Sequence, residues 1–215
     1  HSTSRRQRQM CIRDRFYSLG YNVLAVDARA HGNSEGTKIG MGWPDRLDVI
    51  EWIKLILTWD ENAQIILHGV SMGAATVLMA SGESLPKNVK AVIADCGYTS
   101  EWDEFRLEAK NLHIPWFPVL NVASVISKFR DGYDFKQASA LEQIKKSRIP
   151  TLFIHGTEDE LVPYCMLDEL YTAAYCEKER LTVKGAGHAL SSSVAPELYW
   201  NTVENFIGRY IICLL

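Results

Sequence analysis

The sequence predicts an α/β protein built on a mostly parallel sheet with helices on both faces. Short apolar runs rich in strand-forming residues alternate with segments of helical periodicity along most of the chain. The strand-like runs are apolar throughout, which indicates burial on both faces of the sheet. A length of 215 residues, with 47% hydrophobic and 23% charged residues, suits one domain with a sizeable core.

Five strands are expected, the first four as short, mainly apolar runs bounded by turn-forming residues and the last as a shorter run of mixed character. The first, NVLAV, ends at Asp27 and is followed by a loop that contains glycine and asparagine. In chain order, the expected strands are residues 22–26, 64–67, 89–94, 151–154 and 180–183.

Helices are expected between these strands. One opens at Pro44 and Asp45, and its apolar residues recur at helical spacing, which gives it a core-facing side. The small residues of 72–80 predict a helix that packs closely on the sheet. Two further helices are expected at 161–174 and at 197–210, the second with aromatic and aliphatic residues on one face.

Residues 99–148 interrupt the alternation of strands and helices. They are rich in aromatic residues, and Pro115 and Pro118 break their periodicity. We expect a helical lid insertion over the carboxyl edge of the sheet, where crevices for ligands open in parallel sheets. Its aromatic residues are interpreted as core and lid packing rather than as a cofactor site.

The two ends of the chain do not fit this pattern. Arg5–Arg15 (RRQRQMCIRDR) resembles the in-frame translation of a transposon-type sequencing adapter, and Cys213–Leu215 matches the start of its reverse complement. We therefore expect residues 1–15 and 212–215 to be non-native tails around an N-terminally truncated domain at 16–211. As native sequence, the basic first segment would instead suggest a nucleic-acid arm or a transit peptide.

Charge and cysteine content exclude several classes of protein. The formal net charge is −3, and it becomes −7 without the five arginines and one aspartate of residues 1–15. An acidic body without a basic stripe argues against a nucleic-acid partner. The three cysteines between the tails are scattered, no zinc-ligand spacing or phosphate-binding loop is present, and we expect no metal or other cofactor. No run of about 18 apolar residues occurs, so no membrane-spanning segment is expected.

The stretch HGVSMGAA contains the pattern G-x-S-x-G and places Ser71 between an expected strand and an expected helix. A nucleophile elbow requires this context, because a sharp strand-to-helix turn presents the serine hydroxyl above the sheet. Gly69 and Gly73 are expected to give the turn room. The backbone N–H of Met72 would then point toward the same place and stabilise an oxyanion. The alternative is a serine that caps an ordinary helix.

A serine nucleophile needs a histidine base held by an acid, and the chain supplies both after the serine. The segment HGTEDELVP follows the fourth expected strand and contains Asp159. The segment GAGHAL follows the fifth and contains His188 between small residues. All three candidates come directly after expected strands, so their loops converge at one edge of a parallel sheet.

These segments resemble those of the α/β-hydrolase fold from about Phe16 to Ile211. VDARAHGNSEG, HGVSMG, HGTEDELVP and GAGH carry the resemblance, which is closest to small, mostly uncharacterised bacterial α/β hydrolases. The resemblance implies Ser71 as nucleophile, His188 as general acid and base, and Asp159 as the carboxylate that orients His188. It also implies that a second oxyanion donor lies upstream of Phe16, so this chain is expected to be a weak enzyme or an inactive one.

The function expected from these observations is acyl-bond hydrolysis of a small-molecule substrate, most naturally a carboxylic ester. A peptidase or amidase of the same fold and a catalytically inactive scaffold or fragment are the alternatives. The native chain is expected in the cytoplasm or on a membrane, with membrane attachment only through a segment that precedes this chain.

Other acids and histidines compete for the catalytic roles. Asp95 ends the third expected strand, where some relatives keep their carboxylate, and Glu158 and Glu160 flank Asp159. The remaining histidines are expected to be structural, with one in the insertion that could line a pocket: His31, His68, His155 and His113.

Overall fold

The computed structural model describes residues 2–211, and side chains from residue 10 onward, so the expected tail at 212–215 lies outside the described residues. The chain divides into two compact units, His1–Ile39 and Gly40–Leu215. The first unit contains one helix, α1 (Ser2–Ser18), which includes the adapter-like residues. Among the described residues, no helix has both the length and the apolar character needed to cross a membrane.

The expected strand at residues 22–26 is wrong. These residues carry no strand assignment, and Val23, Leu24 and Val26 are exposed. A strand forms only where its backbone pairs with a neighbour, and the hydrogen bonds of the described residues contain no ladder for this run. An apolar run thus indicates that a segment can form a strand, but it does not show whether a neighbouring strand is present to pair with it.

The second unit is built on a parallel sheet of four strands in the order β1-β2-β3-β4. The two central strands are buried almost throughout, whereas β1 and β4 alternate between more and less buried residues. The expected strands after the first are therefore confirmed, with burial on both faces only in the centre. Their bounds are β1 Ile65–Val70, β2 Val89–Asp95, β3 Thr151–Gly156 and β4 Lys178–Val183.

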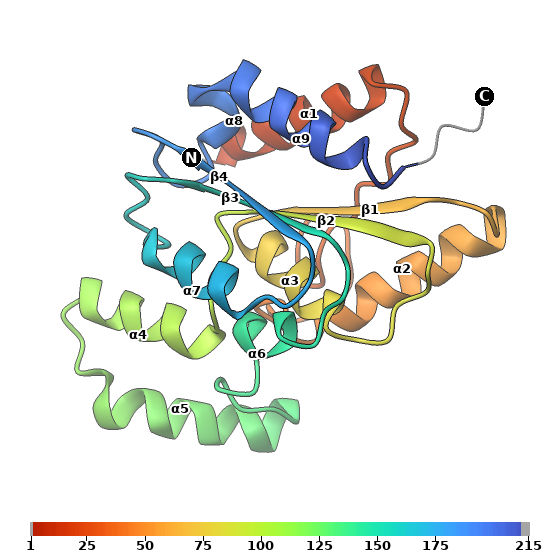
Figure 1. Ribbon diagram of the computed structural model, residues 1–215. Helices are drawn as coiled ribbons and strands as arrows, with labels where there is room; N and C mark the ends of the chain where they lie inside the picture. The colour runs from red at the N-terminus through yellow and green to blue at the C-terminus, as the bar shows by residue number, and fades with distance from the viewer. Residues whose placement is uncertain (1, 212–215) are drawn as a thin grey trace. The chain divides into compact units, whose positions relative to one another are not determined.

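Helices cover both faces of this sheet, as expected (Figure 1). On one face α3 contacts β1 and β2, and α7 contacts β3, while α9 contacts β4 on the other face. The helices of this unit are α2 Asp45–Trp59, α3 Met72–Ser81, α4 Glu101–Asn111, α5 Trp116–Asp131, α6 Ala140–Ile144, α7 Cys165–Ala173, α8 Ser191–Val194 and α9 Pro196–Ile207.

The helix α3 forms the centre of the core. Every residue from Ala74 to Ser81 is buried, and Ala74, Ala75, Leu78, Met79 and Ala80 are fully so. Small side chains let the backbone of α3 approach the sheet closely, as the sequence predicts. Close packing here fixes the position of the residue that immediately precedes the helix.

The helix α7 begins at Cys165, four residues later than the sequence predicts. The difference has a local cause, because the side chain of Asp159 accepts hydrogen bonds from the backbone N–H groups of Leu161 and Val162. An aspartate that binds the backbone two and three residues ahead forms a turn that competes with a helix. Residues 161–164 therefore belong to the loop after β3.

The insertion between β2 and β3 is helical, as predicted, and consists of α4, α5 and α6. Side-chain oxygens of Ser100 and Ser139 accept hydrogen bonds from N–H groups in the first turns of α4 and α6. The helix α4 starts close to the carboxyl end of β2, and Glu104 on it interacts electrostatically with Asp159. The insertion thus reaches the strand ends through α4, while α5 packs against α4.

Candidate active site

The serine of the G-x-S-x-G pattern joins β1 to α3. Ser71 has φ 58° and ψ −121°, a strained conformation for a residue with a side chain. Its side chain makes no capping hydrogen bond to α3, so the capping alternative is wrong. Its Oγ instead lies 2.8 Å from Nε2 of His188. The local geometry is that of the expected elbow.

Glycine is required at one of the two positions of the pattern. A Cβ on Gly69 would lie 2.1 Å from the carbonyl oxygen of Gly73, a distance that no packing adjustment of side chains can relieve. A Cβ on Gly73 would meet nothing within 4 Å. The expectation that both glycines make room is therefore right for Gly69 and wrong for Gly73.

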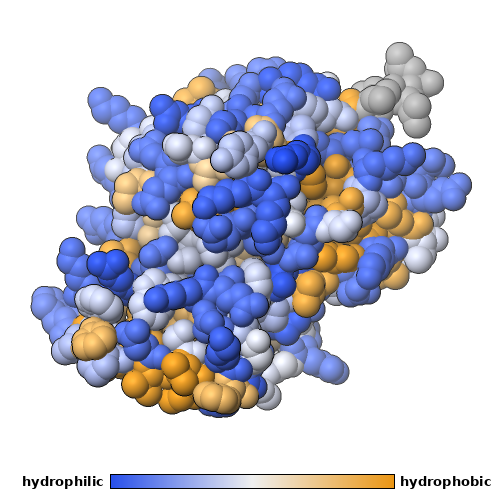
Figure 2. Space-filling view, turned by 60° about the horizontal axis from the view of Figure 1, so that its bottom comes forward, coloured by the Kyte–Doolittle hydropathy of each residue, from blue (hydrophilic) through white to orange (hydrophobic). Residues whose placement is uncertain are grey.

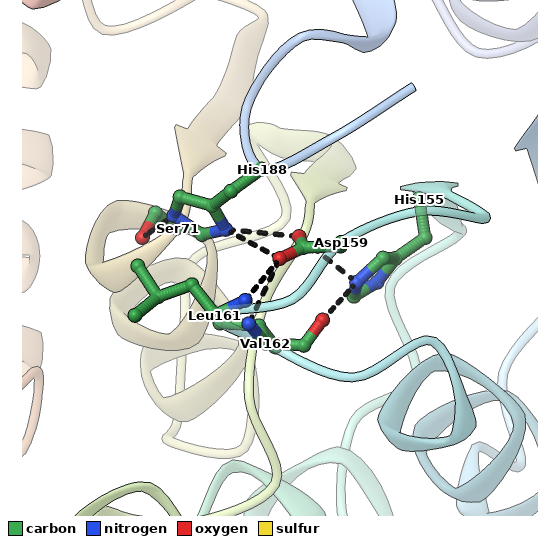
Figure 3. A network of polar contacts seen from close by, with 6 residues as sticks. All are labelled: Ser71, His155, Asp159, Leu161, Val162 and His188. Atoms are coloured by element: carbon green, nitrogen blue, oxygen red, sulfur yellow. Dashed lines mark hydrogen bonds and ion pairs between the residues drawn. The ribbon is translucent and has the colours of Figure 1, made fainter. Parts of the chain in front are cut away.

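Ser71, His188 and Asp159 form one hydrogen-bonded series (Figure 3). Nδ1 of His188 lies 3.1 Å and 2.9 Å from the two carboxylate oxygens of Asp159. An ionised carboxylate only accepts, so the proton of neutral His188 belongs on Nδ1. Nε2 is then free to accept the hydroxyl proton of Ser71, as a general base must.

Several donors hold the carboxylate of Asp159 in place. The N–H groups of Leu161 and Val162 donate to Oδ1 at 3.0 and 2.9 Å, and His155 Nε2 lies 3.3 Å from Oδ2 (Figure 3). Burial by itself would raise the pKa of Asp159. Hydrogen bonds from His155, His188 and the Val162 backbone outweigh burial and hold this pKa well below its usual range. Asp159 is therefore a fixed negative charge beside His188.

The sequence predicts only a structural role for His155, and its contact with Asp159 was not predicted. It is buried, and its Nε2 also donates to the carbonyl of Val162 at 2.8 Å. The ring therefore connects the end of β3 with both the carboxylate and the backbone of the acid loop. The only signal for this contact in the sequence is the position of His155, four residues before Asp159 in HGTED. That spacing does not show toward which side the His155 ring points.

The rival acids do not reach His188 by a hydrogen bond in the structure. Glu158 and Glu160 are exposed, whereas the Asp159 side chain between them is fully buried. Asp95 is buried at the end of β2, where its carbonyl accepts the N–H of Ser71 at 2.8 Å. Burial raises the pKa of Asp95 to about 7, although a hydrogen bond with Tyr199 opposes the shift.

The hydroxyl of Tyr199 also lies 3.1 Å from Nε2 of His68. Burial lowers the pKa of His68 to about 4, so this ring is neutral at pH 7. Asp95, Tyr199 and His68 thus form one connected polar group, in which Asp95 and Tyr199 are buried, and this agrees with the structural role expected for His68.

The last two histidines lie outside the series. Nδ1 of His31 lies 2.9 Å from the carbonyl oxygen of Arg29, a local contact within its own loop, as expected. His113 is exposed at the end of α4 with φ 57°. Neither is brought to Ser71 by a hydrogen bond in the described part of the chain.

Cys96 follows Asp95 and lies within the candidate site. It is buried with φ 49°, and among the described residues its Sγ, Asp159 and His188 form the group of side chains close enough to hold a metal ion. Burial, together with Asp95 and Asp159, raises the pKa of the Cys96 thiol well above its usual range. In this group, Nδ1 of His188 and the carboxylate of Asp159 already bind each other.

Met72 follows Ser71 directly, and Glu104 interacts electrostatically with Asp159. Met72 is the first residue of α3, where backbone N–H groups lack acceptors inside the helix. Glu104 on α4 is buried, and this burial, with the charges of Glu108 and Asp159, raises its pKa to about 7. The candidate site therefore combines a helix N-terminus with a carboxyl group from the insertion.

Comparison with known proteins identifies the family of this arrangement. Residues 8–118 match the model of a family described as alpha/beta hydrolase fold. An uncharacterised protein of Bacillus subtilis, YqkD, is 32% identical over 198 residues, which cover 90% of this chain and 64% of that protein. The chain thus spans less than two thirds of the length of this curated relative.

Two further comparisons carry a named activity. The lysophosphatidylserine lipase ABHD12 of Macaca fascicularis is 28% identical over 158 residues, which cover 73% of this chain and 39% of the lipase. The solved structure of the Pyrococcus furiosus esterase Pf2001 superposes with a TM-score of 0.71 at 25% identity, covering 92% of this chain and 74% of the esterase. Both proteins, one matched by sequence and the other by structure, are named as enzymes that hydrolyse esters or lipids.

Proposed function

We propose, on the premise that this chain belongs to the alpha/beta hydrolase fold family, that it is a serine hydrolase of carboxylic esters. The observation that carries the proposal is the series from Ser71 Oγ through His188 to the carboxylate of Asp159. It joins a nucleophile, a base in the required tautomer and a fixed negative charge.

The reaction would proceed in two steps through an acyl-enzyme. Ser71 Oγ attacks the ester carbonyl as Nε2 of His188 takes the hydroxyl proton, and the same proton then passes to the departing alkoxide. Water next attacks the acyl group on Ser71, giving a proton to His188, which returns it to the Ser71 oxygen as the acid leaves. Asp159 stabilises the His188 cation in both steps.

The N–H of Met72 would stabilise the oxyanion, because it opens α3 beside Ser71. The resemblance to α/β hydrolases implies a second backbone donor that acts together with Met72. Loss of one donor typically costs on the order of a hundred- to a thousandfold in turnover. No cofactor is needed for this chemistry.

Support for an ester substrate comes from two directions. The insertion beside the site is rich in apolar and aromatic residues, which favour an apolar acyl or alcohol group. The relatives with named activities are a lipase and an esterase. A small-molecule ester is therefore the first substrate class to test, with amides second.

The test is labelling of the full chain with a fluorophosphonate, followed by peptide mapping and hydrolysis of p-nitrophenyl butyrate. We expect the label on Ser71, and we expect Ser71→Ala to lose both label and turnover while it unfolds at the same temperature. A label on another residue would sink the assignment. Absence of label from folded chain, both as it stands and extended upstream with the segment of a relative, would also sink it.

A further inference from the structure

The helix α5 is oriented with its apolar side outward. Leu120, Ser124 and Ser127 are its buried residues. The exposed residues recur three or four positions apart, which places them on one side of the helix. We call this exposed apolar side the α5 face, and it consists of Val119, Val122, Val125, Ile126 and Phe129.

Specific hydrogen bonds fix this orientation. The Ser127 hydroxyl donates to the carbonyl of Tyr133 at 3.0 Å, and Ser124 Oγ accepts the N–H of Phe135 at 3.1 Å. The two small polar side chains therefore anchor α5 to the segment that follows it. Because these bonds need both serines on the inner side, the α5 face has to point away from the protein.

The apolar surface continues beyond the α5 face. Trp116 and Phe117 at the start of α5, and Leu112 and Ile114 in the preceding turn, are also exposed. Figure 2 shows apolar residues gathered over α5. Phe129 on the α5 face is 87% exposed. Exposed apolar surface that is continuous in this way marks a binding surface, whereas scattered apolar residues need no explanation.

The exposed charges around this surface are mainly basic, although the chain as a whole is acidic, and one of the basic residues, Lys128, lies 3.5 Å from the carboxylate of Asp134. Asp131 is the one exposed acid between residues 101 and 137, although the chain has a net charge of −3. The guanidinium of Arg106 lies 5.2 Å from the Trp116 ring. Five exposed residues of this segment are basic: Arg106, Lys110, Lys128, Arg130 and Lys136.

We propose that the α5 face docks on an anionic lipid surface. An apolar helix side with aromatic residues at its start and basic residues around it is the arrangement that buries in the headgroup region of a membrane. The face is a ridge along one helix, which suits a deformable lipid surface better than a shaped protein partner.

The placement also connects the docked surface to the candidate site. The helix α5 packs against α4, and α4 carries Glu104, which interacts with Asp159. A lipid surface bound at α5 would thus lie against the helix pair that borders the strand ends. The proposal does not require that the chain hydrolyse esters, because it stands on exposure and charge alone.

The experiment is flotation of the full chain with vesicles of phosphatidylcholine alone and of equal parts phosphatidylcholine and phosphatidylglycerol. We expect binding to the mixed vesicles that weakens with added salt, since charges near a surface are screened. The double variant Val125→Ser/Phe129→Ser should bind the mixed vesicles at least roughly tenfold more weakly. Trp59→Ser is the matched control, because Trp59 is 67% exposed on α2 and should leave binding unchanged.

Three outcomes would overturn the proposal. The first is absence of wild-type binding to both vesicles, and the second is equal binding by wild type and the double variant. The third is a concentration-dependent dimer that the double variant abolishes, without vesicle binding, which would make the α5 face a contact between two copies. Turnover of p-nitrophenyl butyrate in the same samples separates failure at the membrane from failure of the proposed hydrolase.

Discussion

The loop after β3 and the helix α4 both bury carboxyl groups, but with opposite effects on charge. At Asp159, hydrogen bonds outweigh burial and keep the carboxylate ionised. At Glu101 and Glu104, burial dominates, and it raises their pKa values to about 8 and about 7. One carboxyl oxygen of each glutamate has no hydrogen-bond partner in the described part of the chain. The difference teaches that donors, rather than depth, decide whether a buried acid carries charge.

The variant with the largest expected effect tests whether Asp159, rather than Asp95, is the carboxylate that acts on His188. Asp159→Asn should lower kcat for p-nitrophenyl butyrate roughly ten-thousandfold, because the amide favours the wrong tautomer of His188. Asp95→Asn should change kcat far less, since Asp95 makes no hydrogen bond to His188 and its pKa of about 7 leaves it largely protonated below neutrality. Equal losses in the two variants would leave the role of Asp159 without support.

The second effect tests how rigidly the strand-end region is built. Gly69→Ala should lower the free energy of unfolding by about 3 kcal/mol, because its Cβ would collide with the backbone at Gly73. Gly73→Ala is the matched control and should change it by at most about 1 kcal/mol, toward greater stability. Urea unfolding of the two variants measures both values. Similar stability of the two would mean that the elbow relaxes more easily than its geometry implies.

The third effect tests the buried acids of α4 through pH. The pKa of Glu101 rises from its ordinary value of 4.5 to about 8 on folding, mainly through burial, with Asp131 and Asp45 adding to the shift. The folded state then holds the proton more tightly, so stability is present below about pH 4.5 and is lost as pH rises toward 8. The slope of this loss is at most about 1.4 kcal/mol per pH unit for one group.

Urea unfolding at several pH values between 5 and 8 measures this dependence. The side chain in Glu101→Gln stays neutral at every pH. This variant should therefore show a weaker dependence of the free energy of unfolding on pH, and that free energy should rise relative to wild type as pH rises. Glu61→Gln, at an exposed position, should leave the curve parallel to wild type. Parallel curves for Glu101→Gln as well would mean that Glu101 is solvated, and the contrast with Asp159 would fail.

The smallest expected effect concerns the outer side of the insertion. Phe129→Ser should change the free energy of unfolding by no more than about 0.5 kcal/mol, because the ring is almost fully exposed. Leu120→Ala, on the buried side of the same helix, should cost about 2 to 3 kcal/mol. Thermal or urea unfolding measures both. A large loss for Phe129→Ser would show that the α5 face packs on the protein itself.

Much of the sheet and the proposed catalytic residues could be predicted from the sequence. The strands β1 to β4 were predictable because buried parallel strands are continuous apolar runs between turn residues. The strand-to-loop context restricts where a polar side chain can emerge, and the resemblance to α/β hydrolases then favours Ser71, Asp159 and His188 over the neighbouring acids and histidines. The structure brings these three side chains together as the motifs imply.

The remaining features depend on contacts that a linear pattern does not contain. The run at 22–26 has strand character without a pairing partner, and α7 starts late because the side chain of Asp159 forms a turn. The sequence predicts core and lid packing for the aromatic residues of the insertion, whereas Trp116, Phe117 and Phe129 are exposed. The hydrogen bonds of Ser124 and Ser127 hold the other side of α5 against the protein. The contact of His155 with Asp159 likewise depends on how the loop after β3 folds back against the end of that strand.

The positive φ of Ser71 sets the choice of an inactive variant for capturing bound esters. Alanine at position 71 would remove the hydroxyl but keep a Cβ in a conformation that costs on the order of 1 kcal/mol or more. Glycine adopts that conformation freely, so Ser71→Gly would give up turnover and gain thermal resistance together. The proposed nucleophile is thus also a residue that we expect to hold the fold below its attainable stability. A trapping variant of this chain is therefore best made with glycine.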